Sequence, residues 1–116
     1  MSKNSKEKNE ENINFTPDAV VEAFVPGLFV ELVGFVDAIE STKQYGNLRI
    51  FKFILNNSKK YRIQINAYDD DITRTEQEIK LGNVIHLENV RAAVNNKYNK
   101  GNFQGAQLTM HKYTII

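Results

Sequence analysis

Strand-forming side chains, above all valine, isoleucine and phenylalanine, are concentrated in five segments of the chain. These segments are residues 29–40, 48–55, 61–67, 84–94 and 107–115. In the third segment apolar and polar positions alternate, which is typical of a strand with one face against a core. The core face would carry Tyr61, Ile63, Ile65 and Ala67, and the opposite face Arg62, Gln64, Asn66 and Tyr68. The same alternation in the second segment points Phe51, Phe53 and Leu55 inward and Ile50 and Lys52 outward.

Two short helices are predicted beside the strands. Thr16 as N-cap and Pro17 at the first helical position favour a helix over residues 17–24. Three aspartates at 69–71 precede residues 72–80, whose Thr/Glu spacing and closing Lys-Leu-Gly favour the second helix. We interpret these aspartates as helix-capping groups rather than a cation site, because successive residues point in different directions.

The order of elements is three strands, a helix and two strands, with Gly34 marking a bulge or bend in the long first strand. This order predicts an all-β fold, the five-stranded Greek-key barrel called the OB-fold, with its short helix between strands 3 and 4. OB-folds bind single-stranded nucleic acid or oligosaccharide across strands 2 and 3 and with loops 1–2 and 4–5. Here those loops would be "STKQYGN", residues 41–47, and "NNKYNKGNFQG", residues 95–105.

Length and composition fit one folded domain. The chain has 116 residues, of which 41% are hydrophobic. We expect residues 1–14 to be a disordered polar tail and residues 15–116 to form the OB-fold domain. The absence of cysteine excludes disulfides and thiolate zinc sites, and the charged start and the lack of a long apolar run indicate a soluble, intracellular protein with no membrane contact. The formal net charge is only +1, so a polyanion must be met by a local basic patch.

Lysine and aromatic residues occur together in both predicted loops, and the outward face of strands 2 and 3 adds two cations, two amides and a ring. Cations neutralise phosphates, amides read base edges and rings stack on bases, so this combination predicts a surface for single-stranded nucleic acid. The candidate residues are Lys43, Tyr45, Arg49, Lys52, Arg62, Gln64, Asn66, Tyr68, Lys97, Tyr98, Lys100 and Phe103. The alternative is an ordinary polar outer face of an antiparallel sheet.

The second loop contains no aliphatic residue that could bury its two rings. We therefore expect Tyr98 and Phe103 to be exposed and mobile until a ligand orders them. For Phe103 a second role is open, because it lies near the start of strand 5 and can instead cap the open end of the barrel.

Several runs of the sequence resemble the first OB-fold of the protection-of-telomeres proteins, which cap the single-stranded 3′ overhang of chromosomes. These runs are "FTPDAVVEAFVPGLFVELVGFVDAIES", "YGNLRIFKFIL", "KKYRIQINAYD" and "IKLGNVIHLENVRAAVNNKYNKGNFQGAQLTM". The most telling parts are Phe15-Thr16-Pro17, Val33-Gly34-Phe35-Val36 and Gly82-Asn83-Val84-Ile85. More distantly, the chain is similar to the DNA-binding domains of replication protein A and to ciliate telomere-end-binding proteins.

The resemblance implies a nuclear protein of the telomeric region that binds G-rich single-stranded DNA by stacking and hydrogen bonding. The chain departs from the family pattern at Asn66, where the family places a stacking aromatic, with Tyr68 two residues on as a substitute. It also departs at Asp37 and Glu40, where the family tends to use basic and aromatic residues. Two alternatives stay open: a general single-strand binder, and an OB-fold that acts as a protein-interaction subunit of a telomere or replication complex.

No arrangement of residues indicates catalysis. His86 and His111 fall in different strands with no motif around them, and the sequence has no nucleophile–base constellation or phosphate-binding loop. We expect a binding module with no catalytic residues, no metal and no cofactor. Its expected partner is single-stranded DNA, with protein partners in a telomere complex as the alternative.

Overall fold

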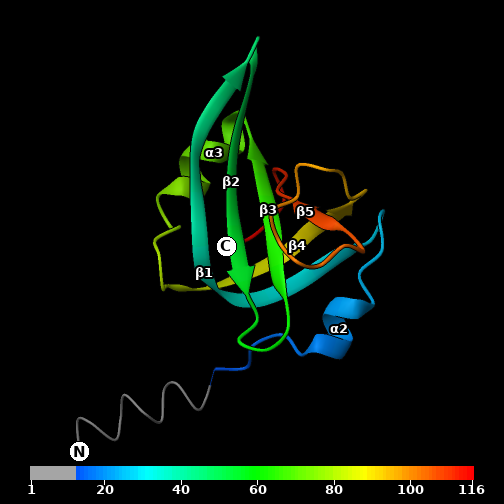
Figure 1. Ribbon diagram of the computed structural model, residues 1–116. Helices are drawn as coiled ribbons and strands as arrows, with labels where there is room; N and C mark the ends of the chain where they lie inside the picture. Colours follow the sequence, from blue (N-terminus) through cyan, green and yellow to red (C-terminus); the bar gives the residue numbers. More distant parts are fainter. Residues whose placement is uncertain (1–12) are drawn as a thin grey trace, which may run out of the picture.

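The computed structural model describes residues 13–116 of the chain. These residues form five strands and two short helices, joined by loops (Figure 1). In chain order they are α2 (Asp18–Glu22), β1 (Phe29–Tyr45), β2 (Leu48–Asn56), β3 (Arg62–Tyr68), α3 (Asp70–Glu76), β4 (Val84–Ala93) and β5 (Gln107–Thr109). The five strands and the helix between β3 and β4 confirm the predicted order. The predicted tail, residues 1–14, lies outside the described residues except for its last two.

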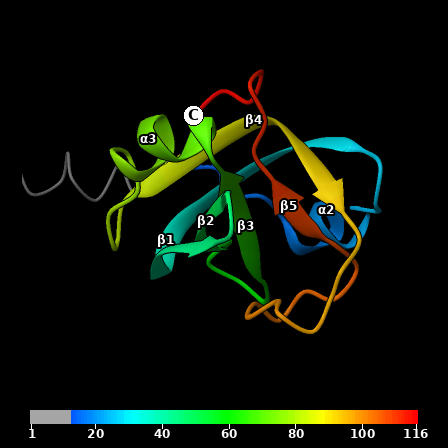
Figure 2. The same ribbon diagram turned by 90° about the horizontal axis from the view of Figure 1, so that it is seen from above.

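The strands close into a barrel in the order β1-β2-β3-β5-β4 (Figure 1, Figure 2). Only β3 and β5 run parallel, and β1 closes the ring because it pairs with both β2 and β4. Gly34 lies where these two pairings meet, between register shifts on either side. A Cβ at Gly34 would come 2.8 Å from the carbonyl oxygen of Asn56, so the bend that the sequence predicts requires glycine there.

The alternation predicted for β2 and β3 is confirmed on the core side. The buried side chains include Phe51, Phe53 and Leu55 from β2, Ile63, Ile65 and Ala67 from β3, and Leu32, Leu87, Val90 and Leu108 from the other strands. Val21 of α2 and Ile72 of α3 are buried in the same core. A close-packed interior makes the barrel a rigid support, which fixes the positions of side chains on its outer face.

The predicted loop between the first two strands is instead part of a long hairpin. β1 continues to Tyr45 and β2 begins at Leu48, so only Gly46 and Asn47 form the turn. Gly46 has a φ of +61°, the left-handed conformation that favours a two-residue hairpin turn. Residues 41–47 therefore project from the barrel as strand and turn rather than as a separate loop (Figure 1).

The last strand is much shorter than predicted, because it ends at Thr109. The next amide, that of Met110, donates a hydrogen bond to the carbonyl oxygen of Asn66 on β3. The chain then turns and reaches β4, where Ile115 forms an isolated bridge with Glu88. The sequence does not show this turn, because residues 107–115 contain no glycine, proline, asparagine or aspartate that would mark one.

The side-chain caps predicted for both helices do not form, although Asp70 and Asp71 do place negative charge in the first turn of α3. The hydroxyl of Thr16 accepts a hydrogen bond from the amide of Val33 on β1 instead of capping α2. Asp69 stands at the N-cap position of α3, but its carboxylate accepts a hydrogen bond from the amide of Arg49. Both side chains thus join a helix entry to a strand. Both helices are shorter than predicted. Within residues 13–116 no helix is long and apolar enough to cross a membrane.

Candidate nucleic-acid interface

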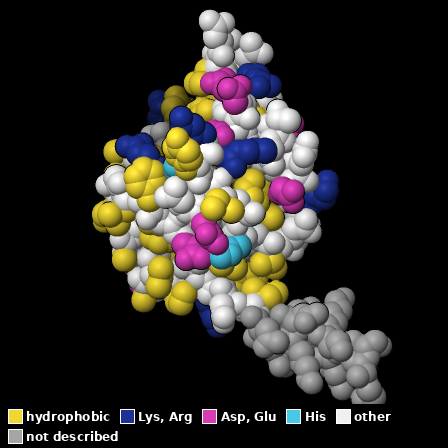
Figure 3. Space-filling model, turned by 180° about the vertical axis from the view of Figure 1, so that it is seen from behind, with side chains coloured by type: hydrophobic (Ala, Val, Ile, Leu, Met, Phe, Trp, Pro, Cys, Tyr) yellow, Lys and Arg dark blue, Asp and Glu magenta, His cyan; other side chains and the backbone are white. Residues whose placement is uncertain are grey.

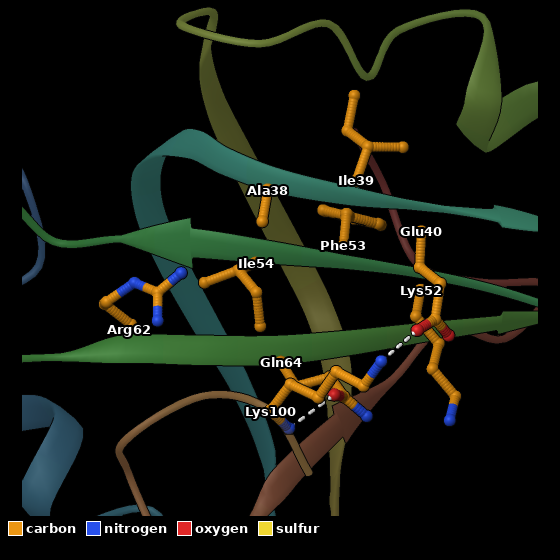
Figure 4. Close-up of a pocket in the computed structure, with 9 residues that line it drawn as sticks. All are labelled: Ala38, Ile39, Glu40, Lys52, Phe53, Ile54, Arg62, Gln64 and Lys100. Atoms are coloured by element: carbon orange, nitrogen blue, oxygen red, sulfur yellow. Dashed lines mark hydrogen bonds and ion pairs between the residues drawn. The ribbon is translucent and has the colours of Figure 1, made fainter. Parts of the chain in front are cut away.

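The outer face of β1, β2 and β3 carries a depression of about 290 Å³ (Figure 4). Its apolar lining includes Ala38, Ile39 and Ile54, and its polar lining is Glu40, Lys52, Arg62, Gln64 and Lys100. Strand register brings these groups together, because Lys52 on β2 pairs with Glu40 on β1 and Ile54 pairs with Gln64 on β3. Four residues of the predicted binding surface therefore meet at one site.

Gln64 and Asn66 lie on the predicted face but are buried, which corrects the expectation that they meet solvent. Their amides form a cluster with Gln107 of β5. Gln64 Nε2 donates to Asn66 Oδ1 and to Gln107 Oε1, and Asn66 Nδ2 donates to Gln107 Oε1. Among residues 13–116, every buried polar side-chain atom has a hydrogen-bond partner. These amides join β3 to β5, so neither is available to read a base.

Loop 4–5, residues 95–105, continues along β3 where the short pairing with β5 ends (Figure 2). The amide of Arg62 donates to Asn102 Oδ1 at 2.7 Å, and the amide of Asn102 donates to the carbonyl oxygen of Arg62 at 2.8 Å. The amide of Lys100 donates to Gln64 Oε1 at 2.8 Å. A Cβ at Gly101 would lie 2.2 Å from the Arg62 carbonyl oxygen. Only glycine permits this approach, so Gly101 lets the loop dock on the strand.

Asparagine side chains hold the conformation of the loop itself. Asn99 Nδ2 donates to Asn95 Oδ1 and to the carbonyl oxygen of Phe103, and Asn99 Oδ1 accepts a hydrogen bond from the amide of Gly101. The loop is therefore held in place although it contains no aliphatic residue. Side-chain amides supply the contacts that aliphatic packing supplies elsewhere.

Tyr98 is an aromatic residue that the loop presents to solvent, with 60% of its surface exposed. The ammonium groups of Lys97 and Lys52 lie 5.3 Å and 5.7 Å from the centre of its ring. Because Lys52 belongs to β2, the loop and the strand face meet at this ring. The ring has one ammonium group beside it on the loop and another on β2. Such a ring can stack on a base while the ammonium groups bind phosphate.

Two cations at the depression are bound by carboxylates of β1. Arg62 Nε donates to Asp37 Oδ2, and Lys100 Nζ donates to Glu40 Oε1, each at 2.5 Å. These hydrogen bonds hold the pKa of both carboxyl groups below its ordinary value, against an opposing effect of desolvation. The hydrogen bond to Glu40 likewise raises the pKa of Lys100. The carboxylates occupy positions on the cations where phosphate oxygens would bind.

The other predicted binding residues on the strands do not line the depression. Tyr45 and Lys43 lie on the projecting part of the β1–β2 hairpin, and both are exposed. Tyr68, at the end of β3, is partly buried, and this burial raises the pKa of its phenol. Arg49 binds elsewhere, because its guanidinium donates to the backbone carbonyl of Asp69 at 3.2 Å.

Phe103 is buried, so its assignment to the binding surface is corrected. Its ring packs edge-on against Phe24 and Tyr61, with centroid distances of 6.4 Å and 5.3 Å. This is the barrel-capping role that the sequence left open.

Sequence reasoning did not include Asp37 and Glu40 in the site, although it recognised both as departures from the family pattern. The available signal was charge balance. Asp37 and Glu40 balance the predicted cations because they lie on the strand that the OB-fold order pairs with strand 2.

No family model matches the sequence, and no curated protein sequence matches it significantly. Solved structures match the fold. A replication protein A heterotrimer bound to ssDNA has a TM-score of 0.70 and 17% identity over 86% of this chain. RecG bound to a three-way DNA junction has a TM-score of 0.54 and 17% identity over 85%, and fission yeast Pot1 with ssDNA has 0.51 and 13% over 91%. The chain spans only 23%, 13% and 37% of those three chains. With the strand order, these likenesses show that the barrel is an OB-fold.

Proposed function

We propose that this OB-fold binds single-stranded DNA across the outer face of β2 and β3, beside loop 4–5. The observation that carries the proposal is the exposed ring of Tyr98 next to Lys52 and Lys97, adjoining a depression that Arg62 and Lys100 line. A strand lying here can stack a base on the ring and place its phosphates near the cations. Two of the solved neighbours, replication protein A and fission yeast Pot1, were determined with ssDNA, which supports this ligand class.

Binding in this way requires cations to exchange partners. Arg62 and Lys100 bind Asp37 and Glu40 in the free protein, and a phosphate must compete with those carboxylates. Partly exposed ion pairs contribute only ~0.2–1 kcal/mol, so a ligand that offers several phosphates at once can displace them. Stacking on Tyr98 adds the requirement for an unpaired base, which favours a single strand over a duplex.

We further propose that the ligand is the G-rich strand of the telomeric 3′ overhang, which would make this a nuclear protein of chromosome ends. The resemblance of the sequence to the protection-of-telomeres family supports this, as does the fold shared with fission yeast Pot1. The proposed function is binding alone and involves no catalytic step or cofactor.

Fluorescence anisotropy with labelled oligonucleotides tests both levels of the proposal. Three ligands are compared: the telomeric G-strand, its complement and a strand of mixed sequence. Binding of any single strand, with an affinity that falls as salt rises, supports the coarser proposal, because each phosphate contact contributes a slope of roughly 0.7. A preference for the G-strand supports the finer one, whereas equal or tighter binding of RNA of the same sequence contradicts it.

A second candidate function, protein interaction within a telomere or replication complex, is favoured by a groove elsewhere on the barrel. This open groove, of about 980 Å³, is bordered by residues 13–17, α2, β1 and β4, and much of its lining is apolar, including Val20, Leu28 and Val33. Exposed apolar surface of this kind is typical of protein interfaces. A stable assembly in light scattering, together with no affinity for any oligonucleotide, would replace the first proposal with this one.

A further inference from the structure

Three side chains with metal-binding atoms converge on the outer surface of β1 and β4. Glu31 projects from β1 and His86 and Glu88 from β4, and one ligand atom from each lies within 4.8 Å of the other two. His86 Nε2 contacts Glu31 Oε2 directly and lies 3.7 Å from Glu88 Oε1. Figure 3 shows histidine and acidic side chains together on the back of the molecule. None of the three belongs to the proposed DNA-binding surface.

The strands place these groups independently of any ligand. His86 and Glu88 are two residues apart in β4, so both point to the same side of the sheet. The register of β1 against β4 shifts at Glu31, opposite Asn89, whose φ is +60°. Bulges of this kind redirect side chains. The bulge here leaves Glu31 beside both residues of β4, on backbone held by strand pairing.

The charges of the cluster are poorly balanced by the protein itself. Within the described residues, the ion pairs of Glu31 and Glu88 are with His86 and with no lysine or arginine. Two carboxylates on neighbouring strands repel each other. A divalent cation bound between them would attract both carboxylates and offset their mutual repulsion.

We propose that Glu31, His86 and Glu88 bind a divalent transition-metal ion, with zinc as the best fit. One imidazole nitrogen and two carboxylate oxygens are donor types that zinc takes in three-ligand sites, where water fills the fourth position. Ligands 2.0–2.2 Å from a tetrahedral ion lie roughly 3.3–3.6 Å apart, close to the 3.7 Å between His86 Nε2 and Glu88 Oε1. The ion would replace the direct contact between His86 Nε2 and Glu31 Oε2. Calcium and magnesium prefer oxygen ligands alone, so the imidazole selects against them.

Isothermal titration calorimetry with zinc chloride tests the site on the whole 116-residue chain. The parent should bind one ion. His86→Ala and Glu31→Gln should each bind it at least ~10-fold more weakly, since even loss of an outer-shell partner costs 10–100-fold in metal affinity. The matched control is His111→Gln, which removes the other imidazole of the chain and should bind zinc like the parent.

Thermal unfolding gives a second readout, because an ion that binds the folded state raises the melting temperature. Zinc should raise that of the parent and of His111→Gln, but not that of His86→Ala. If the parent takes up no zinc, or if His86→Ala binds it as tightly as the parent, the site does not exist. The inference does not depend on DNA binding, and His86→Ala should keep the parent's affinity for single-stranded DNA.

Discussion

Arg62 on β3 binds Asp37 on β1 through a 2.5 Å hydrogen bond that spans β2. The side-chain Nδ2 of Asn56, on the strand between them, donates to the same carboxylate oxygen at 3.3 Å. The guanidinium is therefore positioned before any ligand arrives, and an internal carboxylate neutralises it. The same arrangement recurs between Lys100 and Glu40. The face proposed for DNA thus holds anions of its own on two of its cations.

Substitutions at the two ends of this ion pair should have opposite effects. Arg62→Ala removes a charge-assisted contact and should weaken single-strand binding by at least ~1 kcal/mol. Asp37→Asn releases the cation and should tighten binding, since exposed ion pairs are worth ~0.2–1 kcal/mol. Anisotropy titrations of both variants and the parent at one salt concentration measure this. Changes in the same direction would show that Arg62 does not contact phosphate.

Acid should weaken the Glu40–Lys100 pair. The hydrogen bond from Lys100 lowers the pKa of Glu40 from its ordinary 4.5. A lowered folded-state pKa means that the ion pair stabilises the fold above the unfolded value and that this contribution is lost as pH falls through the folded value. In urea-unfolding measurements, the free energy of unfolding of the parent should therefore fall more across that pH range than that of Glu40→Gln does. The control is Glu78→Gln, at an exposed position, which should follow the parent; an identical acid response of Glu40→Gln would contradict the assignment.

Tyr98→Ala should cost on the order of 1–3 kcal/mol of single-strand affinity, because base–aromatic stacking is worth that much per base. The slope against salt should change little, since no charge is removed. Tyr113→Ala is a matched control: Tyr113 is 66% exposed and has the Lys112 ammonium 5.0 Å from its ring centre, but it lies near the C-terminus, outside the proposed surface. Equal losses in the two variants would mean that Tyr98 is not a specific stacking site.

Lys97→Ala and Lys100→Ala test the charges of the same loop. Each should flatten the dependence of log affinity on log salt by roughly the 0.7 expected for one phosphate contact. The loss should be smaller for Lys100 if Glu40 stays bound to it in the complex. Unchanged slopes for both variants would remove loop 4–5 from the electrostatic part of the interface.

Gly101→Ala should detach the loop from β3, because the new Cβ would lie 2.2 Å from the Arg62 carbonyl oxygen and the backbone must move. We expect a stability loss of ~1–3 kcal/mol, as for other strained or overpacked positions, together with weaker DNA binding. Chemical denaturation and anisotropy measure the two effects. Gln104→Ala, an exposed position in the same loop, is the control, and a parent-like Gly101→Ala would show that docking of the loop is unimportant.

The barrel could be predicted because patterns among neighbouring residues in the sequence indicate its strands. The alternation of Ile63 and Ile65 with polar neighbours fixes the core face of β3, and Gly34 marks the bend that lets β1 pair on both sides. Element ends were harder to predict. The continuation of β1 to Tyr45 depends on a tight turn at Gly46, which the sequence "STKQYGN" does not distinguish from a longer loop.

The site was predicted less completely, because it depends on contacts between distant segments. Alternation places Gln64 and Asn66 on the outer face, but their burial follows from Gln107 and from the path of loop 4–5. That path in turn depends on the close approach of Gly101 to β3, which leaves no mark in composition or periodicity. The convergence of Glu31, His86 and Glu88 likewise requires the pairing of β1 with β4, and their positions in the sequence give no motif.

Binding of single-stranded DNA by the outer face of β2 and β3 is tested most directly by an amide chemical-shift map of the ¹⁵N-labelled protein, recorded while the telomeric G-strand is added. We expect the largest changes to cluster at Lys52, Arg62, Tyr98 and Lys100, with the groove beside α2 and the surface around His86 unaffected. An absence of changes at saturating DNA, or changes confined to the α2 groove, would contradict the claim that the outer face of β2 and β3 binds single-stranded DNA.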